Sequence, residues 1–282
     1  MNKVDRPIIL HFHIFKNAGT TIDWILKKNF GNQAAELSNP DHDAIINMRV
    51  LQYYFELHPN VKSLSSHQFR FPIPQVAGLY FIPIVFVRHP IDRIYSIYHH
   101  FRRWEENHEF YKRAKELTLK EFIEWYLQSD DYSIINNGTM KNSQVCFLSD
   151  LLDLSQISLH HLDLAIQNTK SCQILGVVER TNESLVLAET ILKNHFDNID
   201  LSYISQNVNP ERHDDYKKRI ELFREAVGDK LFDKIMQNNE MDFQLYQEAN
   251  AELDKRIKSL KDFELNMSDF VERCKKLQVR SF

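Results

Sequence analysis

Three short apolar runs in the chain each precede a segment whose apolar residues recur at helical spacing. The apolar runs cover residues 8–15, 80–87 and 172–178, and the helical patterns that follow them cover 21–28, 91–104 and 183–196. Runs of this length and β-rich composition indicate strands, and the second is almost uninterrupted, as in a buried parallel strand. Strands that alternate with helices predict a three-layer α/β fold with a central, mainly parallel sheet.

The rest of the chain is predicted to be largely helical. Residues 105–170 are rich in charged residues and helix formers, which indicates a helical insertion between the second and third strands. An apolar stripe at three- and four-residue steps runs from Phe243 to Phe270 and predicts a long helix or a helix pair. We therefore expect an α/β domain over residues 1–240 and a helical extension over 241–282. The extension would pack on the domain or, as a second interpretation, form a homo-oligomer.

Composition narrows the function classes. The chain has 282 residues, 43% of them hydrophobic, which is enough for a substantial core, and its formal net charge of −4 gives no global reason to expect nucleic-acid binding. Cys146, Cys172 and Cys274 are far apart, so we expect neither a metal site nor a disulfide framework. The apolar N-terminal run is too short to span a membrane and no signal peptide is evident, so the expected location is the cytoplasm.

The most informative segment lies where the first predicted strand meets its helix. Residues 13–21 read His-Ile-Phe-Lys-Asn-Ala-Gly-Thr-Thr. Unpaired amides at a helix start favour an anion, so Gly19, two threonines and Lys16 make a P-loop-like phosphate cradle. The GxxxxGK[ST] pattern is absent, which argues against an ATPase or a kinase. The alternative is an ordinary turn with Thr20 or Thr21 as the N-cap and a solvated lysine.

A second strand end offers another anion-binding group. Arg88 follows the 80–87 run directly, at the edge where open α/β sheets bind ligands, and Ser96 lies two helical turns further on. A guanidinium group suits phosphate because its donors form a rigid fork. The alternative is a structural ion pair between Arg88 and Asp92, or between Arg93 and a nearby acid.

Together, the two segments resemble the sulfotransferase superfamily, in the branch that includes heparan sulfate 2-O-sulfotransferases and bacterial carbohydrate sulfotransferases. In that family a Lys-x-x-Gly-Thr-Ser/Thr loop holds the 5′-phosphosulfate of 3′-phosphoadenosine 5′-phosphosulfate (PAPS), and an Arg-x-Pro…Ser-x-Tyr segment holds the 3′-phosphate. The resemblance implies cofactor binding by Lys16, Asn17, Ala18, Gly19, Thr20, Thr21, Arg88 and Ser96.

Weaker similarities extend the match over about residues 8–250. Residues 142–148 resemble the family's Asn-x-Gln…Leu segment, 176–180 its Gly-x-x-Glu strand end, and 241–246 its Asp-x-x-Leu-Tyr helix. Two positions depart from the pattern: His89 stands where an acid is common, and Asn17-Ala18 stands where a second glycine often occurs. Neither change removes a phosphate donor.

Sulfuryl transfer needs a base near the acceptor hydroxyl and positive charge near the leaving phosphate. Lys16 can supply the charge. Relatives carry a catalytic histidine between the two phosphate motifs, so the resemblance implies His67 as the base, with His13 or a carboxylate as rivals. Arg70 is a further candidate for contacting an anionic ligand. Arg212 lies in a late loop of the kind that relatives close over the adenosine.

The sequence thus predicts a PAPS-dependent sulfotransferase that acts on a hydroxyl acceptor, with a carbohydrate as the acceptor by analogy and a small molecule as another option. No metal is expected to take part. Two alternatives stay open: a small-molecule kinase that uses a similar phosphate cradle, and a catalytically inactive nucleotide-binding module that retains the fold.

Overall fold

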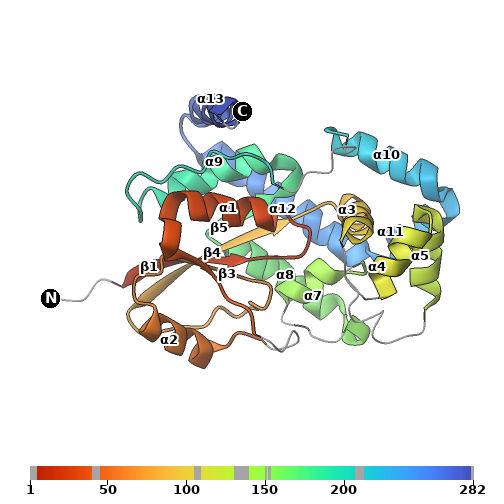
Figure 1. Cartoon of the computed structure of the whole chain (residues 1–282), viewed down its shortest axis with the longest axis horizontal. Coiled ribbons are helices and arrows are strands. Elements are labelled where there is room, and N and C mark those ends of the chain that lie inside the picture. Colours follow the sequence, from red (N-terminus) through yellow and green to blue (C-terminus); the bar gives the residue numbers. More distant parts are fainter. Residues whose placement is uncertain are drawn as a thin grey trace.

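The computed structural model describes residues 5–39, 45–104, 109–129, 140–149, 151, 154–206 and 213–280. Its sheet contains five parallel strands in the order β2-β3-β1-β4-β5 (Figure 1). The strands are β1 Arg6–Phe12, β2 Ala34–Glu36, β3 Ser63–Ser66, β4 Leu79–Val87 and β5 Ile174–Val177. The prediction of an α/β fold with a central parallel sheet is confirmed.

Helices account for most of the remaining described residues. They are α1 Gly19–Phe30, α2 Met48–Leu57, α3 Pro90–Arg103, α4 Glu109–Glu116, α5 Leu119–Gln128, α7 Ser143–Leu148, α8 Leu159–Ser171, α9 Thr181–Leu192, α10 Tyr216–Val227, α11 Asp229–Asn238, α12 Glu240–Ser259 and α13 Phe263–Arg280. Short 3-10 helices occupy Gly31–Gln33, Leu154–Gln156 and Val178–Arg180. Within the described ranges, none of the helices combines the length and the apolar character needed to cross a membrane.

Side chains that point alternately to one side and the other of each strand divide the hydrophobic core between the two faces of the sheet. In β1, Ile8, Leu10 and Phe12 face a cluster that includes side chains of α2, α7, α8 and α12. Ile9 faces the opposite cluster, formed with α1, α9 and α13. Because successive side chains of a strand point to opposite faces, one buried strand serves both layers. A third cluster joins α3, α4, α5, α10 and α11 beside the sheet (Figure 1).

The sequence patterns did not reveal β2, β3 or α2. The sequence of β3 is Ser-Leu-Ser-Ser, and all four residues are buried between β2 and β1. Serine side chains are small enough to lie under the neighbouring helices, and Ser66 Oγ accepts from the amide of Gln68 at 3.0 Å. A strand built from such residues lacks the apolar signal by which strands are recognised.

The apolar stripe near the C-terminus belongs to a helix pair, α12 and α13. Leu245 and Leu253 of α12 are fully buried against the sheet layer. Phe270 of α13 is also fully buried, in the cluster that contains α9. Arg273 adds ion pairs to Glu189 at 2.9 Å and to Asp200. The described part of the extension therefore docks on the same chain, along α9 (Figure 1).

If α13 is part of the folded unit, Phe270→Ala should lower the free energy of unfolding by about 3–5 kcal/mol, because it removes a fully buried aromatic ring. The matched control is Leu265→Ala on the same helix, whose side chain is 71% exposed and whose loss should change stability by less than about 0.5 kcal/mol. Urea denaturation measures both variants. Equal stability of the two would show that α13 does not contribute to the core.

Candidate active site

A cleft of about 710 Å³ opens at the carboxyl ends of the central strands. Its walls come from the loop after β1, from α3, from the chain after β5 and from α10. The predicted site residues that line it are Lys16, Ala18, Gly19, Thr20, Thr21, His67, Arg88 and Ser96. Two segments that are about 70 residues apart in the sequence therefore meet at one concave surface, as expected for ligand sites of open parallel sheets.

Two other candidates, Asn17 and Arg70, point away from the cleft or lie outside its lining. The Asn17 side chain is buried behind the loop, where its Nδ2 donates to Phe86 O at 2.7 Å and to Gln144 Oε1 at 2.8 Å. Arg70 does not line the cleft, and its guanidinium stacks on the Phe147 ring at 4.2 Å. Arg212 lies outside the described residues.

The loop before α1 has an unusual backbone. Lys16 and Ala18 have φ values of 65° and 63°, in the left-handed region that few residues other than glycine adopt. Two buried arginines hold the carbonyl oxygens of this loop, since Arg93 Nε donates to Phe15 O at 3.0 Å and Arg88 Nη1 donates to Lys16 O at 2.7 Å. With these carbonyls bound, the amide end of α1 is presented to the cleft, where its partial positive charge favours an anion.

The start of α1 also differs from the alternative in which Thr20 or Thr21 is the N-cap of an ordinary turn. The helix begins at Gly19, two residues before the predicted start, and Ala18 precedes it without a side-chain cap. Thr21 Oγ1 instead accepts from the amide of Gln206 at 3.2 Å. The two threonines therefore do not cap α1, and Thr20 is exposed at the rim of the cleft.

A buried polar network fixes the loop from below. Gln144 Oε1 accepts from the Arg88 amide at 2.9 Å and Nε2 donates to Arg88 O at 2.9 Å. Asp242 in turn accepts from the amides of Gln144 at 3.2 Å and Val145 at 2.9 Å. Burial raises the pKa of Asp242 even though Arg93 and these amides act to lower it. The weakly matching segments around residues 142 and 242 thus support the site and do not line it.

Arg88 takes part in a buried ion-pair cluster. Its Nε and Nη2 lie 2.9 and 2.8 Å from Asp92 Oδ2. Arg219 of α10 approaches the same carboxylate, with Nε 2.5 Å from Oδ1 and Nη2 2.9 Å from Oδ2. The alternative ion pair between Arg88 and Asp92 is therefore present in the structure. Arg219 was not identified from the sequence, because a single arginine on a charged helix gives no motif.

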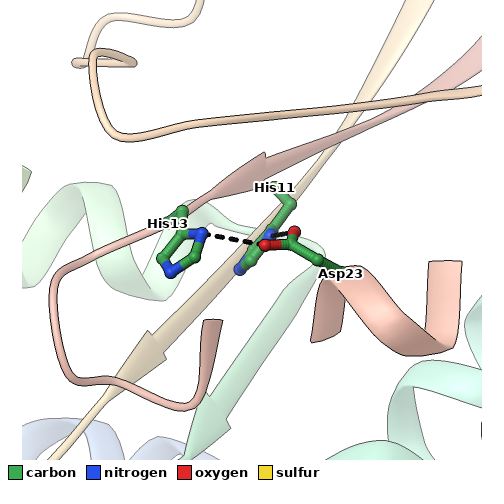
Figure 2. Close-up of side chains that lie close together, drawn as sticks. All are labelled: His11, His13 and Asp23. Carbon is green, nitrogen blue, oxygen red and sulfur yellow. Dashed lines mark hydrogen bonds and ion pairs between the residues drawn. The ribbon is translucent and has the colours of Figure 1, made fainter. Parts of the chain in front are cut away.

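Three histidines and one aspartate form a second cluster beside the loop. His11 and His13 point from β1 and the residue after it toward Asp23 of α1 (Figure 2). His11 Nδ1 lies 2.7 Å from Asp23 Oδ1, and His13 Nδ1 lies 2.9 Å from Oδ2. The ring of His67 lies against that of His13, with 3.9 Å between centroids. The sequence contained a signal for the pairing of His11 and His13, since residues two apart along an extended chain point to the same face.

These contacts set the charge state of the cluster. Burial acts to raise the pKa of Asp23, but the hydrogen bonds from His11 and His13 outweigh it and hold that pKa well below its usual range. Burial lowers the pKa of His11 despite its bond to Asp23. Burial and the nearby His13 also lower the pKa of His67 to about 4. His67 is therefore neutral at pH 7, as a proton acceptor must be.

A protonatable acid lies on the opposite wall. Glu179 follows β5 and accepts from the amide of His89 at 3.0 Å. Burial, with Asp92 nearby, raises the pKa of Glu179 to about 7. Its charged neighbours act on this pKa in opposite directions, since Asp92 raises it and Arg88 lowers it.

The model of the sulfotransferase family matches residues 3–247 of the chain. The chain belongs to the sulfotransferase family. This family includes heparan sulfate 2-O-sulfotransferases and carbohydrate sulfotransferases. An uncharacterized protein of Archaeoglobus fulgidus is 27% identical to this sulfotransferase over 249 residues, which cover 87% of this chain and 97% of the relative. Membership assigns sulfuryl transfer as the general reaction.

The raised pKa of Glu179 predicts a pH-dependent cost of folding. The unfolded state loses the Glu179 proton near pH 4.5 and the folded state near pH 7, so this group's contribution to stability falls as pH rises through that window. Glu179→Gln should therefore gain stability relative to the wild type between pH 5 and pH 8, by at most about 1.4 kcal/mol for each unit of pKa difference. Urea denaturation at several pH values measures the difference. A difference that does not vary with pH would contradict the assignment.

Proposed function

We propose that this sulfotransferase moves a sulfuryl group from PAPS to a hydroxyl group of a carbohydrate by in-line displacement. The observation that supports the proposal is the meeting of three predicted groups on one cleft: the loop of residues 16–21, His67, and the Arg88 and Ser96 pair of the second strand end. The loop would hold the phosphosulfate, and His67 would accept a proton from the acceptor. Arg88 and Ser96 would contact the 3′-phosphate.

The cleft residues fit a nucleotide that bears anionic groups at two ends. Lys16 and the first turn of α1 supply donors at one position, and Ser96 and the Arg88 cluster lie at another. Arg88 also holds the carbonyl of Lys16, so the same side chain would couple the two phosphate sites. In the proposed mechanism Lys16 and the helix amides stabilise the negative charge that develops on the leaving 5′-phosphate.

His67 is the proposed base. Its neutral imidazole would accept the hydroxyl proton of the acceptor as the new bond to sulfur forms. A pKa of about 4 makes a weak base, but a polyanion bound beside the ring would raise that pKa toward neutrality, because nearby negative charge favours the imidazolium form. The proposal uses protein side chains alone for the chemical step.

The acceptor proposal rests on the family and on the outer wall of the cleft. Phe15, His100 and Trp104 form a row of rings there, with 5.2 Å between the first two centroids and 5.2 Å between the last two. Trp104 is half exposed. Aromatic side chains offer the apolar faces on which sugar rings pack, beside polar groups that fix orientation.

Titration calorimetry with 3′-phosphoadenosine 5′-phosphate (PAP), the product nucleotide, tests the proposal. We expect micromolar binding of PAP and no comparable binding of ATP with magnesium. Lys16→Ala and Ser96→Ala should each weaken PAP, the lysine variant by roughly 1.5–3 kcal/mol, as expected for a charged hydrogen bond. The matched control is Lys27→Ala, an exposed lysine at the other end of α1, which should bind PAP normally.

The alternatives predict different results. A preference for ATP with magnesium would favour a small-molecule kinase. Normal PAP binding without any release of sulfate from PAPS, even to water, would favour an inactive nucleotide-binding module. Arg88→Lys is preferable to Arg88→Ala in such tests, because it retains a donor within the buried cluster.

A further inference from the structure

His13 occupies the space between the predicted base and the phosphate loop. It lines the cleft, its ring contacts that of His67, and its Nδ1 bonds to Asp23 (Figure 2). The opposite edge of the ring faces Gly19, because a Cβ atom added there would lie 2.0 Å from both Cδ2 and Nε2 of His13. Gly19 therefore has to be glycine to leave room for this imidazole. The contact places Nε2 beside the amide end of α1.

The geometry distinguishes a hydrogen-bonded cluster from a metal centre. His11, His13 and Asp23 could in principle ligate an ion, since their donor atoms lie within 4.8 Å of one another. The two nitrogen–oxygen separations, however, are 2.7 and 2.9 Å. Ligands of a tetrahedral zinc ion at about 2.0–2.1 Å would lie about 3.3 Å apart. Each carboxylate oxygen of Asp23 instead accepts from one imidazole, which fixes both rings with Nδ1 protonated.

The negative charge of Asp23 disfavours an anionic ligand nearby, and a proton added to the cluster would offset that charge. Asp23 is ionised, and it lies beside a loop that would bind a phosphosulfate. The titratable groups that contact the ring of His13 are His11 on β1, which stacks on it, Asp23 on α1 and His67 after β3. His11 is fully buried, whereas the His13 side chain is 17% exposed and reaches the cleft. Because Nδ1 is bonded to Asp23, Nε2 is the ring nitrogen of His13 that is left to take up a proton that would offset Asp23.

We propose that His13 is a second catalytic imidazole: when the nucleotide binds, its Nε2 takes a proton from solvent, and the resulting imidazolium donates to the phosphosulfate end of the ligand. Asp23 is then a positioning residue that orients the ring and balances its charge. The two histidines divide the work, with neutral His67 accepting the proton of the acceptor and His13 supplying positive charge, while the anionic ligand and Asp23 offset the repulsion between the two rings. This inference rests on the proposed function.

Proton uptake on PAP binding tests the proposal without an acceptor. Calorimetry at pH 7.5 in buffers of different ionisation enthalpy measures the number of protons bound. The wild type should take up more protons than His13→Gln or Asp23→Asn. The phosphates of PAP contribute equally to the wild type and both variants, so the difference measures the proton on His13. Both variants should bind PAP about tenfold more weakly. His160→Gln, an exposed histidine on α8, is the matched control and should behave as the wild type.

Nitrogen-15 spectra of the histidine rings supply a second readout that a structural role would not change. In the wild type, the His13 signals should move from the Nδ1–H tautomer to the imidazolium form when PAP is added, while Asp23→Asn should block the change. His67→Gln should retain this change and lose release of sulfate from PAPS.

The possible failures are distinguishable. Absence of PAP binding to the wild type would overturn the proposed function itself. Normal PAP binding with unchanged affinity and proton uptake in His13→Gln would overturn the role of His13 and leave the proposed function intact. Tight binding of Zn²⁺ to the wild type that is lost in Asp23→Asn, together with no excess proton uptake, would show that the cluster is a metal site instead.

Discussion

The site depends on one constraint: the carbonyl groups of the loop before α1 have to be held away from the cleft. Two residues in this loop, Lys16 and Ala18, adopt left-handed backbone angles, which are costly for residues with a Cβ atom. Arg88 and Arg93 bind the carbonyls of Lys16 and Phe15, and each arginine is itself buried. A strained loop persists only where its surroundings determine it completely, and here two charged donors and a glutamine do so.

This arrangement explains why segments far apart in the sequence matter to one loop. Gln144 bonds to both backbone groups of Arg88 and accepts from Nδ2 of Asn17, and Asp242 accepts from the amides of Gln144 and Val145. Each member of this network is buried, so a missing partner would leave a polar group unsatisfied. Helices α7 and α12 thereby become parts of the scaffold that supports this loop, although they contribute no side chain to the cleft.

The sequence predicted the architecture and a set of residues that line one cleft because those features have strong local signals. Apolar runs of strand length identified β1, β4 and β5, and a glycine with two threonines at a strand end identified the loop. The serine-rich β3 gave no such signal. Roles that depend on tertiary contacts were also out of reach: Asn17 points inward, and Arg219 and Asp23 join the site only through packing. A motif indicates which residues are present, whereas their partners are set by the fold.

The ion-pair cluster has a further electrostatic consequence. Arg88 and Arg219 both contact the single carboxylate of Asp92, so these three side chains have one positive charge in surplus. Glu179 lies close enough to influence the charges of Asp92 and Arg88, and ionised it would cancel the surplus. Burial raises the pKa of Glu179 to about 7, which keeps much of it protonated near neutrality and preserves the positive charge beside the cleft. The same burial that makes Glu179 costly as an anion therefore keeps this wall suited to a phosphate group.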